Sequence, residues 1–128
     1  MPERVRAIIK DGGSLLLIHR VKNGHEYWVF PGGGIEQSDT SPEAALLREC
    51  LEELGVTVSV DKLFVKNNGE LFYECRITGG QLGTGNGPEF QEDTTYEGLY
   101  ALEWIPIQSL ADYEVLPAVV KEAIGRDA

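Results

Sequence analysis

Arg48, Glu49, Glu52 and Glu53 lie together in the short stretch RECLEE. If the stretch is helical, residues three and four apart are neighbours, so the three carboxylates gather on one side. Like charges at that spacing destabilise a helix by roughly a few tenths of a kcal/mol, so folding alone does not favour the cluster. Mg²⁺ and Mn²⁺ prefer oxygen ligands, and Mg²⁺ commonly shares carboxylates with substrate phosphates. The alternatives at this point are a divalent-cation site and a solvated acidic face with an Arg48–Glu52 ion pair.

A helix from about Pro42 to Leu54 is predicted to carry these charges. Ser41 is a good N-cap, Pro42 suits the first helical position, and Gly55 can take the left-handed conformation that ends a helix. The apolar positions at helical spacing predict one buried face, made of Leu47, Cys50, Leu51 and Leu54. We expect the three glutamates on the opposite side.

A glycine run precedes this helix. Pro31 is followed by Gly32, Gly33 and Gly34, and glycine permits positive φ and a close approach of the backbone to a ligand. A glycine turn alone is common in proteins. A glycine turn just before a helix that reads Arg-Glu-x-x-Glu-Glu-x-Gly is a much more specific pattern, and it favours the cation site.

Together these residues resemble the signature of the Nudix hydrolases. That signature is a glycine, five residues, a glutamate, seven residues, and Arg-Glu-aliphatic-x-Glu-Glu-x-Gly-aliphatic. Gly33 and residues 48–56 match it, with Cys50 where an aliphatic residue is usual. The loop departs from it, because Asp39 stands at the glutamate position and eight residues then precede Arg48. In the family the loop carboxylate supports the helix arginine, so Asp39 and Glu36 are both candidates for that role.

The resemblance implies roles for the candidate site residues. Glu49 and Glu53 would be the principal ligands of Mg²⁺, with Mn²⁺ as the alternative metal, and Glu52 would bind metal or act as the base. Arg48 would orient a carboxylate, and a carbonyl of Gly33 or Gly34 would complete the coordination. A later loop often supplies a further carboxylate in this family. The candidates for it are Glu89, which we prefer, Glu92 and Asp93.

The candidate substrate contacts come from the strands and the glycine run. Arginines near the N-terminus could touch a phosphate or a base, although arginines of a strand more often lie on an exposed face. One strand aromatic could reach a ligand, although strand aromatics usually belong to the core. These candidate substrate contacts are Arg4, Arg6, Gly32, Gly34 and Phe72.

The implied activity is Mg²⁺-dependent hydrolysis of a phosphoanhydride bond in a nucleoside diphosphate linked to another group. The small size is similar to that of MutT-like members, which favours a nucleoside triphosphate, oxidised or not. ADP-ribose and dinucleoside polyphosphates are the alternative substrates. A non-catalytic module that binds a nucleotide and regulates a partner is the alternative class, supported only by the altered loop acid. Because family members are often dimers, a homodimer is compatible with the resemblance.

Composition limits the class of protein. The 128 residues, with 42% hydrophobic and 25% charged, predict a single globular domain over residues 1–128. The net charge of −10 argues against a nucleic-acid polymer as partner. We find no signal peptide and no apolar run long enough to span a membrane. Cys50 and Cys75 are expected to be buried thiols in a reducing cytoplasm.

Alternating and continuous apolar runs predict the other elements. Strands are expected at 4–10, 14–21, 27–30, 56–67, 70–78 and 99–105, and a last helix at 116–124. Tight turns are expected at 11–13 and at 68–69, and polar loops at 22–26 and 79–92. This order predicts an α+β fold in which helices sandwich a mixed, curved sheet, and the Nudix resemblance implies the same architecture.

Overall fold

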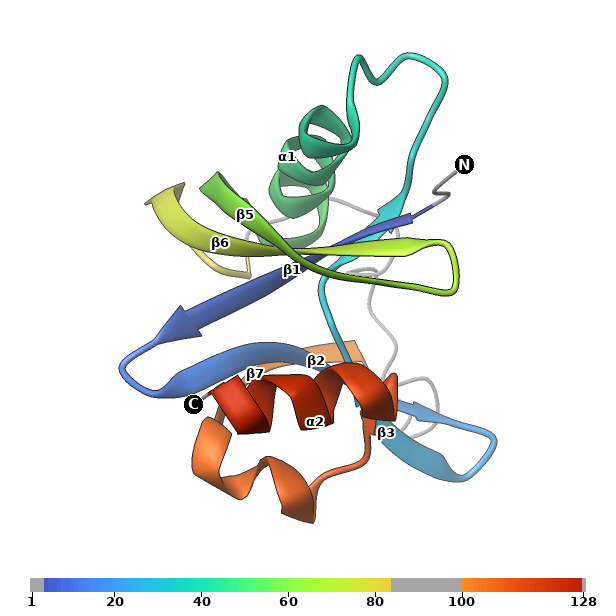
Figure 1. Cartoon of the computed structure of the whole chain (residues 1–128), viewed down its shortest axis with the longest axis vertical. Helices are drawn as coiled ribbons and strands as arrows, with labels where there is room; N and C mark the ends of the chain where they lie inside the picture. Colours follow the sequence, from blue (N-terminus) through green and yellow to red (C-terminus); the bar gives the residue numbers. More distant parts are fainter. Residues whose placement is uncertain (1–3, 84–99, 128) are drawn as a thin grey trace. The chain divides into compact units, whose positions relative to one another are not determined.

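The computed structural model describes residues 4–83 and 100–127, which form two compact units (Figure 1). Unit 1 comprises the described residues 4–9 and 31–83, and unit 2 comprises 10–30 and 100–127. The loop acids considered above, Glu89, Glu92 and Asp93, lie outside the described residues. The single domain over residues 1–128 stays a prediction.

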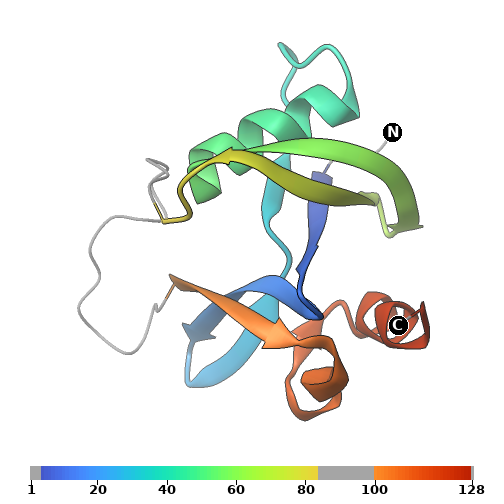
Figure 2. The same cartoon turned by 90° about the vertical axis from the view of Figure 1, so that its left-hand side faces the viewer.

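Unit 1 contains a mixed sheet and one helix (Figures 1 and 2). Its strands are β1 (Arg4–Asp11, the last two residues of which belong to unit 2), β4 (Gly32–Gly34), β5 (Val56–Asn67) and β6 (Glu70–Gly80), in the order β5-β6-β1-β4. β1 runs parallel to β6 and antiparallel to β4, while β5 and β6 form an antiparallel hairpin. The helix α1 (Pro42–Leu54) lies alongside this hairpin.

Unit 2 is built on the central strand β2 (Ser14–Lys22), which is antiparallel to β3 (His25–Val29) and to β7 (Tyr100–Pro106). The short β8 (Val115–Leu116) is parallel to β3. A 3₁₀ helix, η2 (Ile107–Asp112), follows β7, and α2 (Ala118–Asp127) ends the described chain. In the part of the chain that the structure describes, no helix is long and apolar enough to cross a membrane.

The expected α+β class and mixed sheet are confirmed, and local signals account for most of the element bounds. The turn at Asn68-Gly69 closes a hairpin with φ of 48° and 80°, as two-residue type I′ turns require. The region 22–26 was expected to be a loop. It is instead a second such turn at Asn23-Gly24, with φ of 53° and 75°, and both flanking strands extend to meet it.

Two short strands were not predicted. β4 is made only of glycines, which have low strand propensity, and it exists because its backbone pairs with Arg4, Val5 and Arg6 of β1. β8 has two residues and shows no periodicity that a sequence pattern could reveal. Both strands depend on a partner strand that is distant in sequence.

The buried face of α1 includes Cys50 and Leu54 as predicted, but it is rotated by about a quarter of a turn from the predicted face. Leu47 and Leu51 are 44% and 54% exposed, whereas Glu53 is only 5% exposed. The residues of α1 that are buried are Ala45, Leu46, Cys50, Glu53 and Leu54. Burial of a carboxylate requires a hydrogen-bonding partner inside the protein, and β4 provides one, as described below.

Both cysteines are buried free thiols, as expected. Burial raises the pKa of the Cys75 thiol to about 12, and burial also raises the pKa of Cys50, with a contribution from nearby Cys75. Thiols with raised pKa values form little thiolate at neutral pH and are therefore poor nucleophiles.

The C-terminal end of α1 allows a test of whether Gly55 caps the helix. Gly55 has φ 79° and its N–H donates to the Leu51 carbonyl. We expect Gly55→Ala to lower the free energy of unfolding by about 1 kcal/mol, because alanine is strained in the left-handed region. Gly125→Ala, within α2 and with open space at the added Cβ, should raise it by about 0.5 kcal/mol. Urea denaturation measures both, and a neutral Gly55→Ala variant would contradict the capping role.

Candidate active site

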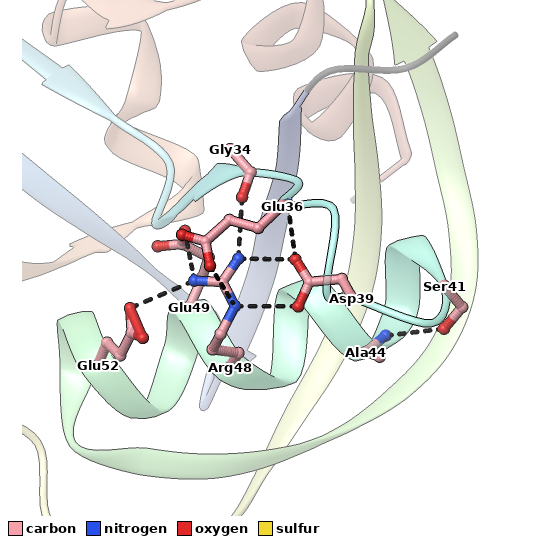
Figure 3. A network of polar contacts seen from close by, with 8 residues as sticks. All are labelled: Gly34, Glu36, Asp39, Ser41, Ala44, Arg48, Glu49 and Glu52. Carbon is pink, nitrogen blue, oxygen red and sulfur yellow. Dashed lines mark hydrogen bonds and ion pairs between the residues drawn. The ribbon is translucent and has the colours of Figure 1, made fainter.

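The guanidinium of Arg48 is the centre of a polar network in unit 1 (Figure 3). Its Nε donates to Asp39 Oδ1 at 3.0 Å and its Nη2 donates to Asp39 Oδ2 at 2.8 Å. Nη2 also donates to the Gly34 carbonyl at 3.0 Å. The paired contact with Asp39 is the bidentate arrangement in which charge-assisted hydrogen bonds are strongest.

Asp39, not Glu36, supports the helix arginine. The Asp39 side chain is 7% exposed, while Glu36 is 62% exposed and approaches Arg48 only to 3.8 Å. A tight turn brings the short aspartate into place, because the Asp39 N–H donates to the Glu36 carbonyl at 3.0 Å and the Glu36 N–H donates to Asp39 Oδ2 at 2.7 Å. The shorter acid in the longer loop therefore makes the contact with Arg48 that the resemblance implies.

These contacts shift the titration of both partners. The hydrogen bonds from Arg48 and from the Glu36 backbone hold the pKa of Asp39 below its usual range. The hydrogen bond to Asp39 in turn raises the pKa of Arg48, with smaller contributions from the charges of Glu49, Asp39 and Glu36. The pair therefore stays ionised across the neutral pH range.

Two of the predicted metal ligands converge on the same nitrogen of Arg48. Nη1 lies 3.2 Å from Glu49 Oε2 and 3.3 Å from Glu52 Oε2 (Figure 3). Glu49 is mostly covered, whereas half of the Glu52 side chain is exposed. The repulsion expected between these carboxylates is thus offset by one shared positive charge.

Glu53 connects α1 to β4, the strand made only of glycines. Its Oε1 accepts a hydrogen bond from the Gly32 N–H at 2.8 Å, which explains how a glutamate is accommodated on the buried side of α1. The run expected to be a glycine turn is the strand β4. Gly32 has φ 143° and lies so close to Val5 and Arg6 of β1 that a side chain has no room there.

Gly33 lies directly beneath Glu49. A Cβ built on Gly33 would come within 2.5 Å of the Glu49 carboxylate. Absence of a side chain at this position therefore allows the carboxylate to rest on the backbone of β4. A glycine at position 33, as in the family signature, therefore suits the close approach of Glu49.

The remaining sequence-predicted residues are dispersed. Arg4 is exposed at the start of β1, and Arg6 Nε donates to Glu70 Oε1 at 2.9 Å. Phe72 was expected to reach a ligand, but it is fully buried, so that expectation is not supported by its position. Among the described residues, no three His, Cys, Asp or Glu side chains converge as a preformed metal site.

Sequence reasoning missed two contributors. Glu70 was assigned only as a strand residue, although opposite charges on β1 and β6 become neighbours once the parallel register is known. The Gly32 N–H as a partner of Glu53 also depends on the packing of α1 against β4. No local pattern in the sequence indicates either contact.

Comparisons with known proteins agree with this geometry. A model of the NUDIX domain family matches residues 2–121. The CTP pyrophosphohydrolase of Escherichia coli (strain K12) is 32% identical over 120 residues, covering 92% of this chain and 85% of that protein. An RNA pyrophosphohydrolase of Marinomonas sp. (strain MWYL1) is 41% identical over 66 residues, covering 52% of this chain and 39% of that protein.

Structural similarity extends over almost the whole chain. A solved structure from an analysis of MutT of Aliivibrio salmonicida and Vibrio cholerae has a TM-score of 0.65 and 25% identity, and the match covers 98% of both chains. This likeness supports the fold class inferred from the sequence. The chain spans about half or less of the length of some curated relatives that it matches.

The Asp39–Arg48 pair gives a pH prediction. Because the folded-state pKa of Asp39 is lowered, its stabilising contribution is present above the ordinary aspartate value of about 3.9 and is lost as pH falls through the lower folded value. The free energy of unfolding of Asp39→Asn should therefore fall less between about pH 5 and pH 3 than that of the wild type. Urea denaturation at each pH measures this. Glu36→Gln is the control and should keep the wild-type slope, whereas equal slopes for Asp39→Asn and the wild type would contradict the assignment.

Proposed function

Because this chain belongs to the NUDIX family, we propose that it is a divalent-cation-dependent hydrolase of a phosphoanhydride bond in a nucleoside diphosphate linked to another group. The observation that carries the proposal is the convergence of Glu49 and Glu52 on Arg48, beside the glycine strand that Glu53 holds. This arrangement places three carboxylates of one helix beside the backbone of β4, in which Gly33 and Gly34 are partly exposed.

The carboxylates suit a Mg²⁺ or Mn²⁺ ion in their chemistry. Glu49 and Glu52 already share one positively charged group, so their oxygens tolerate close approach around a cation. We assign Glu49, Glu52 and Glu53 as the residues that would hold the ion. When bound, the ion would neutralise phosphate charge and lower the pKa of a water molecule. Gly33 or Gly34 would contribute a carbonyl, and Gly34 would share its carbonyl with Arg48.

The chain's own residues prepare this site. Arg48 fixes the positions of Glu49 and Glu52 through Nη1, and Asp39 prevents the guanidinium from rotating away. The buried Glu53 fixes β4 against α1. Glu52 is the more exposed carboxylate, which makes it our candidate for the base if it does not bind the ion. Glu89 is retained as a candidate acid from the loop outside the described residues.

The preferred substrate is a nucleoside triphosphate, oxidised or not. The relative that aligns over most of this chain is named a CTP pyrophosphohydrolase, so CTP is included among the candidates. ADP-ribose, dinucleoside polyphosphates and the 5′ end of an RNA are the alternatives, the last because of the name of a partial relative. The net charge of −10 disfavours a long polyanion. A cytoplasmic location, as a monomer or a homodimer, fits this substrate class.

The alternative of a non-catalytic regulatory module has lost its single support. That support was the altered loop acid, and Asp39 makes the bidentate contact with Arg48. The regulatory module is therefore kept only as an outcome of the activity test.

Activity should depend on the metal and on the glutamates of α1. We expect Mg²⁺-dependent turnover of at least one compound in a panel of nucleoside triphosphates, 8-oxo-dGTP, ADP-ribose, diadenosine polyphosphates and a 5′-triphosphate RNA. Glu52→Gln and Glu53→Gln should each lower kcat/KM by about 100-fold or more, since loss of even an outer partner of a metal site costs about 10–100-fold. Glu43→Gln, on the first turn of the same helix, is the matched control and should leave it unchanged. Products are identified by chromatography.

Several outcomes would count against this proposal. Full turnover in both Glu52→Gln and Glu53→Gln would overturn the ligand assignment. Nucleotide binding without turnover would favour the regulatory module. Because Glu53 is buried, the thermal stability of each variant is measured alongside, and Glu52→Gln gives the test at an exposed position. An unchanged rate in Glu89→Gln would remove that loop acid from the site.

Gly33 gives a separate test of the carboxylate position. Its backbone tolerates alanine, but the added Cβ would displace the Glu49 carboxylate. We expect Gly33→Ala to lower turnover by about tenfold or more and to weaken the thermal stabilisation by Mg²⁺, with little loss of stability in the absence of metal. Gly79→Ala, in β6 of the same unit, is the control. Turnover equal to that of the wild type would show that Glu49 need not rest on Gly33.

A further inference from the structure

A groove of about 580 Å³ lies in unit 1 between α1 and the hairpin of β5 and β6, along which the helix runs (Figure 2). Leu47 of α1 and Leu63 of β5 line it, and these residues are 44% and 49% exposed. Val58 and Val60 of β5 add further apolar surface. Binding sites for small molecules typically measure about 300–1,000 Å³ and have mostly apolar walls. The groove therefore has the size and the walls of such a site.

Tyr73 of β6 also lines the groove and brings a hydroxyl to it. Only 7% of this residue is exposed, and within the described part of the chain no group forms a hydrogen bond with its hydroxyl. Burial raises the pKa of Tyr73, with a smaller contribution from the negative charge of Glu43, which lines the same groove. The hydroxyl thus lies toward the groove in its protonated form, ready to donate one hydrogen bond and accept another. Buried polar groups almost always have a partner, so this hydroxyl points to a ligand.

The charges beside the groove limit the ligands that it can take. Arg76 Nη2 donates to Asp61 Oδ1 at 3.1 Å. Lys62 Nζ lies 3.4 Å from Glu74 Oε2. Asp61 and Lys62 line the groove, so these two of its charges are already paired. Glu43 has no ion-pair partner among the described residues and leaves a negative charge at the groove. An anion is therefore repelled, whereas an uncharged or cationic molecule is not.

We propose that this groove is a binding site for a small apolar molecule that carries a hydroxyl or amine group and no negative charge. The apolar body of the molecule rests between Leu47 and Leu63, and its polar group exchanges a hydrogen bond with the Tyr73 hydroxyl. A molecule without such a group would displace water from that hydroxyl and leave it unpaired, which is unfavourable in a buried position. None of the described residues that line the groove belongs to the Arg48 network, so the site is separate from the candidate active site.

A second copy of the chain is a less suitable occupant of the groove. β5 is the outer strand of its sheet, so pairing of two such edges is the simplest way to join two copies there. The register of β5 with β6 is irregular at three points, and the exposed Lys62 and Lys66 lie on β5. Irregular pairing and lysines are features that keep edge strands from joining. A small molecule is thus the occupant that the groove fits.

Three probes of similar size test the chemistry of the site in the intact, ¹⁵N-labelled chain. Benzyl alcohol carries a hydroxyl, toluene lacks it, and benzoate has a negative charge instead. We expect benzyl alcohol to shift the backbone amide signals of residues 58–63 until the groove is saturated. Benzoate should bind at least about tenfold more weakly, because Glu43 repels it. Shifts that do not saturate, or that are spread over the whole chain, would overturn the proposal, as would equal binding of benzoate.

Variants of the groove residues separate the role of the hydroxyl from that of the walls. Tyr73→Phe removes only the hydroxyl and should weaken benzyl alcohol about fivefold while leaving the binding of toluene unchanged. Leu47→Ala shortens one exposed wall and should weaken both probes. Leu51→Ala, which changes an exposed leucine of α1 outside the groove, is the matched control and should weaken neither. Urea denaturation checks that each variant folds. Equal loss of both probes in Tyr73→Phe, or full affinity for both in Leu47→Ala, would contradict the site.

Competition with a nucleotide distinguishes the groove from the candidate active site. Benzyl alcohol should bind equally well with and without CTP and Mg²⁺, because the residues of the groove and of the Arg48 network differ. Displacement of benzyl alcohol by CTP with Mg²⁺ would place the probe in the active site and would overturn the proposal. The readout is binding of the probe rather than turnover, so it is independent of the proposed activity.

Discussion

The guanidinium of Arg48 is the constraint on which the candidate site depends. One planar cation joins Asp39 of the loop, the Gly34 carbonyl of β4, and Glu49 and Glu52 of the same helix. Arg48 stays charged at any pH at which the protein is folded. Two N–H groups of its planar guanidinium can donate to the two oxygens of one carboxylate. A lysine could not hold these groups together, since its single ammonium cannot form the bidentate contact. The acidic cluster is therefore held by geometry as well as by charge.

β4, the strand made only of glycines, also helps to hold the carboxylates of α1 in position. β4 has no side chains, so β1 can approach Gly32, the Glu49 carboxylate can rest on Gly33, and Glu53 can reach a backbone N–H. A buried carboxylate is tolerated because a donor is already aligned with it. The position of α1 then follows from Glu53 as much as from its leucines. This accounts for the exposure of Leu47 and Leu51, which hydrophobicity alone would have buried.

Features that depend on residues close together in the sequence were predicted correctly, whereas features that depend on residues far apart in the sequence were not. The caps of α1 at Ser41 and Gly55 and the turn at Asn68-Gly69 are local, and all were predicted correctly. The contact of Asp39 with Arg48 was left open, because the choice depended on how the Glu36–Asp39 turn folds. β4 and the burial of Glu53 were not predicted, since each depends on which elements become neighbours in the folded chain. Periodicity reports which face of an element is apolar, but it does not report its partner.

The Arg48 network also determines how the candidate site responds to pH. Asp39 and Arg48 hold each other in their charged forms, since the pKa of Asp39 lies below its ordinary value and the pKa of Arg48 lies above it. Arg48 remains charged at any pH that leaves the chain folded, so the carboxylates around it lose their partner only when they are themselves protonated. Mild alkali should therefore leave the network intact, and acid should act on it through its carboxylates.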